Sequence, residues 1–215
     1  MITPDTKPPG KNPVIDEYTR IAPDYDKKWS FYIDATTRET VARLNLRPTD
    51  RVLDVGCGTG SLLYYLVSSY PKAQLSGIDL VPEMLAIARR RLPPSIELRE
   101  GSVEHLPFED EQFDIVVSCS MFHYIHNPIA VLRQIHRVLR SGGQLVITDW
   151  CDDYIACRIC DLYLRLFNRA HFKTYGKKEC LRLLEEADYT EVKVESFKIN
   201  WLWGLMTARA KKYVA

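Results

Sequence analysis

A glycine-rich turn carries the strongest chemical signal in the sequence. The apolar run RVLDV at 51–55 ends in GCGTG at 56–60, and an apolar, helix-like segment follows at once. Glycine loses more backbone freedom on folding than any other residue, so repeated glycines favour left-handed backbone angles or the close approach of a ligand. An ordinary strand–helix turn needs only one glycine. The N–H groups of such a turn attract anionic or polar ligand groups. The three glycines are Gly56, Gly58 and Gly60.

The second signal is an acidic residue at the predicted end of the next strand. Asp79 follows the glycines by about twenty residues, where a carboxylate can accept hydrogen bonds from both hydroxyls of a ribose. The dinucleotide fingerprint is G-x-G-x-x-G, whereas this chain has G-x-G-x-G preceded by Asp54. A carboxylate at that place suits a ligand with a cationic or zwitterionic tail better than a pyrophosphate. This favours S-adenosylmethionine over a nicotinamide dinucleotide.

These residues need a sheet that brings the ends of several strands together. Strands and helices are predicted to alternate, which indicates an α/β sheet of mostly parallel strands with helices on both faces. Ligands bind beyond the carboxyl ends of such strands. The predicted strands are 51–55, 74–79, 95–99, 113–119 and 144–149, and the predicted helices between them are 60–70, 82–91 and 128–139.

The flanking segments predict additions to this sheet. Residues 1–12, rich in proline and lysine, are expected to form a disordered tail. The prediction is then a single domain over 13–215 with a Rossmann-like, doubly wound sheet of seven strands and a helical cap insertion at 150–175 after the fifth strand. The flanking elements are helices near 13–22, 30–45, 151–170 and 177–187, and strands in VKVESFKI and NWLWGLMTARA.

Composition limits the partners of the chain. The 215 residues carry 29 basic and 28 acidic side chains, a formal charge of +1, without a basic stripe for a nucleic acid. No apolar run reaches the roughly eighteen residues of a transmembrane segment, and the N-terminus has no apolar signal core. The chain is therefore expected to be cytoplasmic, with reduced cysteines. The C-x-x-C of Cys157 and Cys160 lacks a second pair, which favours thiols buried on a helix over a metal site.

Four strand ends together resemble one protein family. The segments VLDVGCGTG, GIDLVPEML, GSVEHLPFEDEQFDIVVSCSMFHYIHNP and VLRSGGQLVITD are similar in order and spacing to the class I S-adenosylmethionine-dependent methyltransferases. The resemblance is nearest to the small-molecule and quinone methyltransferases. It covers about residues 18–190 and is most specific at 51–149. It implies S-adenosylmethionine as the cofactor and a small-molecule methyl acceptor.

The resemblance assigns cofactor contacts to the residues at these strand ends. The glycine turn would lie against the methionine part of the cofactor. Asp54 would hydrogen-bond at that turn or to the ammonium group, and Asp79 would hold the ribose. Leu80 and Met84 would pack on the adenine, although Met84 also fits plain helix–sheet packing.

Further contacts are implied around the two ends of the cofactor. Ser102 and Val103 would border the adenine edge. The family usually has Asp where this chain has Ser102, which leaves the Val103 N–H as the expected donor. Cys119 would offer its backbone carbonyl to the ammonium group. Tyr25 would close over the cofactor carboxylate, or else belong to a surface helix.

Methyl transfer by in-line displacement needs a nucleophile, methyl and sulfur that are aligned and shielded from water. His123 follows the fourth strand, where it is either a general base or a packing residue. Asp149 and His171 are the other bases that the sequence offers. The aromatic cap either roofs a flat or apolar acceptor or packs onto the sheet. The expected acceptor-binding residues are Trp150, Tyr154, Tyr163, Phe167 and His171.

Two other functions stay open from the sequence. A nicotinamide-dependent oxidoreductase is disfavoured by the glycine spacing. A cofactor-binding regulator or an inactive methyltransferase homologue would share every motif described above, and only turnover with an acceptor separates it from an enzyme.

Overall fold

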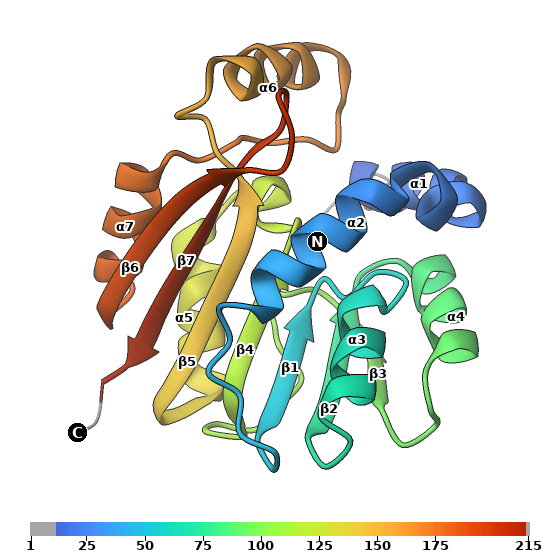
Figure 1. Cartoon of the computed structure of the whole chain (residues 1–215), viewed down its shortest axis with the longest axis vertical. Coiled ribbons are helices and arrows are strands. Elements are labelled where there is room, and N and C mark those ends of the chain that lie inside the picture. Colours follow the sequence, from blue (N-terminus) through green and yellow to red (C-terminus); the bar gives the residue numbers. More distant parts are fainter. Residues whose placement is uncertain (1–11, 214–215) are drawn as a thin grey trace, which may run out of the picture.

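A seven-stranded sheet organises the computed structural model, which describes residues 12–213 (Figure 1). The sheet order is β3-β2-β1-β4-β5-β7-β6. The first five strands are parallel, and β7 runs antiparallel to both β5 and β6. The strands are β1 (Arg51–Val55), β2 (Gln74–Asp79), β3 (Glu97–Glu100), β4 (Phe113–Cys119), β5 (Leu139–Trp150), β6 (Tyr189–Lys198) and β7 (Gly204–Lys212).

Helices cover both faces of the sheet (Figure 1). Residues of α3 and α4 share one buried cluster with β1 and β2, and residues of α5 and α7 share the other with β4 and β5. The helices are α1 (Pro13–Ile21), α2 (Tyr25–Val41), α3 (Ser61–Ser69), α4 (Pro82–Arg91), α5 (Pro128–Val138), α6 (Ile155–Phe167) and α7 (Lys177–Glu186), with the 3-10 turns η1 (Ala22–Asp24) and η2 (Phe122–Tyr124).

The central strands are apolar because both of their faces are covered. In β1, Leu53 and Val55 are fully buried, and in β4 so are Val116 and Val117. The order of the strands reverses between β1 and β4. From β1 the chain continues outward to β2 and β3 on one side, whereas from β4 it continues to β5 on the other side. A crevice forms at such a switch point, beyond the carboxyl ends of the strands. The predicted sheet of seven mostly parallel strands is confirmed.

The structure differs from the prediction mainly at the N-terminus and in β5. The second helix begins at Tyr25 rather than near residue 30, because η1 turns the chain directly from α1 into α2. The fifth strand begins at Leu139, which pairs with Phe113 of β4, rather than at residue 144. The predicted tail lies outside the described residues apart from Asn12, whose side chain accepts a hydrogen bond from Val14 and caps α1.

The insertion after β5 forms α6, which stands above the end of the sheet (Figure 1). Cys157 is the buried residue of α6 and its thiol bonds to Gly204 at the start of β7, whereas Cys160 is half-buried. Among residues 12–213, no helix has both the length and the apolar character that crossing a bilayer requires.

Candidate functional site

A cavity of about 260 Å³ opens at the carboxyl ends of β1, β2 and β4. A second cavity of about 60 Å³ adjoins it, lined by Asp54 and the start of α3, and shares with it Tyr25 and Cys119. Gly56, Gly58 and Ser120 also line both cavities, so the two adjoin at the switch point of the sheet. The larger cavity brings together these predicted cofactor residues: Tyr25, Gly56, Gly58, Asp79, Leu80, Met84, Ser102, Val103 and Cys119.

The glycine turn has three left-handed residues with different surroundings. Gly56, Gly58 and Gly60 have φ values of +72°, +52° and +77°. A Cβ on Gly56 would collide with Met121, whereas a Cβ on Gly58 would meet no atom within 4 Å. The open space beside Gly58 therefore belongs to the cavity.

Gly60 lines neither of the two cavities, so its predicted contact with the cofactor stays a prediction. A Cβ there would lie 2.8 Å from Leu92 and 3.2 Å from Ala88 of α4. Its φ is positive, and its role is the close approach of the turn to α4.

Asp79 connects the two turns that border the cavity. Its Oδ2 accepts a hydrogen bond from the Gly58 N–H at 2.7 Å, and its Oδ1 accepts one from the Val81 N–H at 2.9 Å. Burial raises the pKa of this carboxyl, and the backbone donors act against that rise. The carboxylate is thus held at the tip of β2, facing the space where a ribose is predicted.

Asp54 is a buried acid without a complete set of partners. It is 2% exposed, and its Oδ1 has no hydrogen-bond partner among the described residues. Burial, together with the nearby Asp79, raises its pKa to about 8. A buried carboxylate that lacks a donor is costly, so this atom indicates a missing cationic or N–H partner.

The N-terminal helices close the site from one side. Asp26 accepts a hydrogen bond from the Thr59 hydroxyl at 2.6 Å and forms an ion pair with Arg91 at the end of α4. Beside it, Tyr25 lines both cavities, and burial raises its pKa so that the hydroxyl stays protonated. These contacts hold the start of α2 over the glycine turn.

The cavity also includes residues that the sequence did not single out. Tyr18 of α1 and Tyr124 of η2 lie at its wall with their hydroxyls 2.6 Å apart. Glu104 lies beside Ser102, whose Oγ accepts its N–H at 3.2 Å. Glu104 lies two residues after Ser102, the position where the family usually has Asp. The sequence therefore did contain a sign that an acidic residue stands near this edge of the cavity. Tyr18 has no such signal, because its position follows from how α1 docks.

His123 lies behind the cavity wall and is not part of its lining. The ring Nδ1 of His123 is 2.7 Å from Oδ1 of Asp149. The backbone N–H of His123 donates to Oδ2 of the same carboxylate at 3.1 Å. Its backbone carbonyl accepts hydrogen bonds from the N–H groups of Phe172 and Lys173, which follow α6. His123 therefore ties η2 to β5 and to the segment that follows α6, and its role as a general base stays a prediction.

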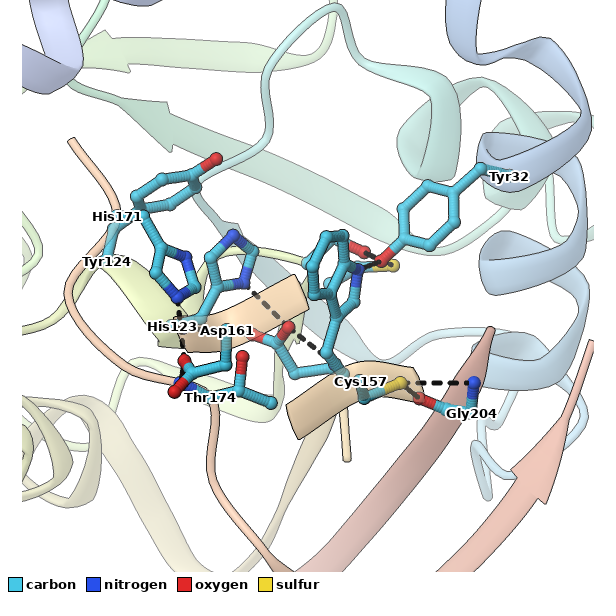
Figure 2. Close-up of polar contacts among 12 residues, drawn as sticks. Tyr32, His123, Tyr124, Cys157, Asp161, His171, Thr174 and Gly204 are labelled. Atoms are coloured by element: carbon cyan, nitrogen blue, oxygen red, sulfur yellow. Dashed lines mark hydrogen bonds and ion pairs between the residues drawn. The ribbon is translucent and has the colours of Figure 1, made fainter. Parts of the chain in front are cut away.

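A second histidine–carboxylate pair faces the first. His171 Nε2 is 2.8 Å from Asp161 of α6, and its ring lies 5.4 Å from the ring of His123 (Figure 2). Burial lowers the pKa of His171 despite the hydrogen bond that its ring donates to Asp161, which favours a neutral ring at pH 7. Like His123, it is absent from the cavity lining, so its predicted contact with an acceptor also stays a prediction.

The predicted acceptor aromatics do not gather at the cavity. The Trp150 indole N–H donates to the Tyr32 hydroxyl at 2.7 Å, and Tyr154 packs against Gly204. Tyr163 and Phe167 line neither of the two cavities, and Phe167 lines a groove beside α1. Tyr163 and Phe167 are 61% and 72% exposed on the outer side of α6, so their predicted contact with an acceptor stays a prediction. Neither side chain roofs the cavity.

Comparisons with known proteins agree with this geometry. The family described as "Methyltransferase domain" matches residues 53–147, which contain β1 to β4 and most of β5. Phosphoethanolamine N-methyltransferase 1 of Arabidopsis thaliana is 30% identical over 173 residues, covering 74% of this chain and 33% of the plant protein. Demethylmenaquinone methyltransferase of Thermus thermophilus is 36% identical over 140 residues, covering 62% of this chain and 64% of that protein.

Among solved structures, a chain in the complex of the Haloferax volcanii Trm112 methyltransferase activator with a methyltransferase matches with a TM-score of 0.83. The identity is 20%, and the match covers 94% of this chain and 98% of the other. The fold, the order of the strand ends and the family match now agree. The chain belongs to the class I S-adenosylmethionine-dependent methyltransferases. It spans from a third to under two thirds of the length of the two curated methyltransferases described above.

The residues present fit the cofactor of the methyltransferase family. The unpartnered Oδ1 of Asp54 would accept the ammonium of the methionine part, and Asp79 would hold the ribose. Gly58 leaves the space between them free of side-chain atoms. Leu80, Met84 and Val103 give the other end of the cavity the apolar walls that an adenine needs.

The free space at Gly58 generates a test of the cavity. In Gly58→Val, the branched side chain should enter the cavity and abolish binding of S-adenosylhomocysteine, measured by calorimetry. Because φ at Gly58 is positive, the variant also carries local strain of roughly 1–2 kcal/mol. A thermal melt therefore accompanies the assay, and Gly60→Ala, beside Leu92 and outside the cavity, is the control for packing. Unchanged affinity in Gly58→Val would contradict the placement of the ligand.

The raised pKa of Asp54 predicts a pH dependence of binding. A ligand ammonium prefers the ionised carboxylate, so below the pKa of about 8 binding must release a proton. The affinity for S-adenosylhomocysteine should then rise toward pH 8 by up to about tenfold per pH unit. Calorimetry in two buffers of different ionisation enthalpy counts the proton. Asp54→Asn should remove both the release and the pH dependence, and a dependence that survives in this variant would assign it to another group.

Proposed function

We propose that the chain transfers a methyl group from S-adenosylmethionine to a small apolar or aromatic acceptor by in-line displacement. The observation that carries the proposal is the pairing of an unpartnered, buried Asp54 with Asp79 across the open Gly58 turn. One end of this arrangement attracts an ammonium group and the other attracts hydroxyls. A dinucleotide would instead bring its anionic pyrophosphate to the glycine turn, beside the carboxyl group of Asp54.

When bound, the cofactor supplies an activated methyl group on a sulfonium, so the protein has to align the acceptor and exclude water. Tyr25 and the Asp26–Thr59 contact hold α2 over the glycine turn. The joined hydroxyls of Tyr18 and Tyr124 close the wall on the other side. These part-buried contacts limit the access of water to the cavity.

The cavity lining favours an apolar acceptor over a phosphorylated one. Met121, Tyr124 and Ile125 supply apolar surface beside the glycine turn, and none of the described residues that line the larger cavity is lysine or arginine. Recognition of a phosphate normally uses arginine or lysine. Of the two acceptors that the relatives' names give, demethylmenaquinone and phosphoethanolamine, the apolar quinone is closer to what this lining suits.

Turnover with a panel of acceptors tests the proposal. The full chain is incubated with S-adenosylmethionine and a hydroxylated naphthoquinone, a phenol, an aromatic amine or phosphoethanolamine, and S-adenosylhomocysteine formation is followed by mass spectrometry. We expect turnover with an aromatic acceptor and none with phosphoethanolamine. Tight cofactor binding without turnover on any acceptor would favour a cofactor-binding regulator instead.

Asp79 provides a quantitative test of cofactor binding. Asp79→Ala removes the hydrogen bonds to the ribose, which should weaken binding of S-adenosylhomocysteine at least about 100-fold, since bonds to charged groups contribute roughly 1.5–3 kcal/mol each. Asp110→Ala, an acidic residue outside both cavities, is the matched control and should bind as wild type. A folded Asp79→Ala protein with wild-type affinity would contradict the assignment.

His123 stays the proposed general base for an acceptor that must lose a proton. Because Asp149 engages Nδ1, Nε2 is the nitrogen left to receive that proton. His123→Gln should lower turnover by about 100-fold or more at unchanged cofactor affinity. If cofactor affinity and melting temperature fall together with turnover, His123 serves the fold alone.

A further inference from the structure

The outer face of α6 carries an apolar stripe that no described residue covers. Its side chains are between 61% and 76% exposed, far more than large apolar residues in a core-facing helix. Their spacing of three and four residues places them along one face of the helix. Contiguous exposed apolar surface of this kind marks an interaction site. The stripe consists of Ile155, Ile159, Leu162, Tyr163, Leu166 and Phe167.

The contacts of the opposite face fix the rotation of α6. Cys157 is buried and its thiol bonds to the Gly204 carbonyl at 3.3 Å. Asp161 accepts the Thr174 N–H at 2.6 Å and pairs with His171 (Figure 2). Because these polar contacts hold the inner face, the apolar stripe cannot turn toward the sheet without breaking them.

The exposed charges on α6 itself are positive, whereas the groove at its end also includes Asp16 and Glu17 of α1. Arg158 and Arg165 are exposed on α6, and Arg169 is exposed just after it. The helix has a single acidic residue, Asp161, which pairs with His171 on the inner face and lies 3.7 Å from Arg165. At the adjoining β6–β7 turn, Trp201 is 84% exposed.

We propose that the α6 stripe docks this chain onto an anionic lipid membrane surface. An amphipathic helix that lies in the interface buries its apolar face among the acyl chains and places cationic side chains among anionic headgroups. An exposed tryptophan beside it suits the headgroup level. A two-fold dimer through this face would set the arginines of one copy against those of the other, since such an interface uses the same patch on both copies.

The docked orientation has a consequence for the cavity. Phe167 and Arg169 line a groove between the end of α6 and α1, and Pro13 and Ala170 line both that groove and the larger cavity. Docking through α6 would thus bring one mouth of the cavity close to the lipid surface. Access of a lipid-dissolved acceptor by this route rests on the proposed function, whereas the docking itself does not.

Co-sedimentation of the full chain with vesicles tests the docking without any methyl transfer. The vesicles contain phosphatidylcholine and phosphatidylserine at about 7:3, or phosphatidylcholine alone. Wild-type protein should bind the anionic vesicles, and high salt should weaken this binding. Leu166→Glu should lower the bound fraction about tenfold or more. Tyr65→Glu, which adds the same charge at an exposed apolar position of α3, is the matched control and should bind as wild type.

The cationic rim is tested by a second pair of variants. Arg165→Gln/Arg169→Gln should bind anionic vesicles several-fold more weakly, whereas Arg133→Gln/Arg182→Gln, with the same loss of charge on α5 and α7, should not. A circular dichroism melt of each variant checks that it folds. Absence of wild-type binding to anionic vesicles, or equal binding by Leu166→Glu, would overturn the proposal. A dimer in analytical ultracentrifugation that Leu166→Glu separates, without vesicle binding, would assign the stripe to a second copy.

Discussion

The site depends on one carboxylate, that of Asp79, which joins two turns that are far apart in the chain. It accepts the N–H of Gly58 from the turn after β1 and the N–H of Val81 from the turn after β2. Parallel pairing sets β1 beside β2 with Val55 opposite Ile78, so the two turns emerge at one edge. The left-handed angle of Gly58 points its N–H at the acid and leaves the ligand space open. A side chain on Gly58 would therefore disturb both the hydrogen bond to Asp79 and the space for the ligand.

The second constraint is that Oδ1 of Asp54 has no hydrogen-bond partner among the described residues. The residue is buried in β1, and both its burial and the neighbouring Asp79 make its ionisation less favourable. The structure therefore keeps a carboxyl with a raised pKa at the position where a ligand cation would approach. Buried groups with perturbed pKa values gather at functional sites for this reason.

The cap shows how one helix divides its roles between its two faces. Inward, polar contacts through Asp161 and Cys157 tie α6 to the segment around His171 and to β7. Outward, the helix presents its large apolar side chains and its arginines. The aromatic residues that suggested an acceptor pocket from the sequence are therefore divided as well. Trp150 belongs to the hydrogen-bonded interior, whereas Tyr163 and Phe167 belong to the surface.

The sequence by itself determined the sheet and the residues at the ends of its strands. Glycine spacing, the acid at Asp79 and the nearly continuous apolar runs of β4 and β5 are local signals, because backbone geometry and double burial restrict residue types position by position. Only the tertiary structure decided which way α6 turns, that Gly60 serves packing against Leu92, and that Tyr18 reaches Tyr124. These outcomes depend on contacts between distant segments. A 3.6-residue period shows that a helix has two faces but does not show which one the rest of the chain will bury.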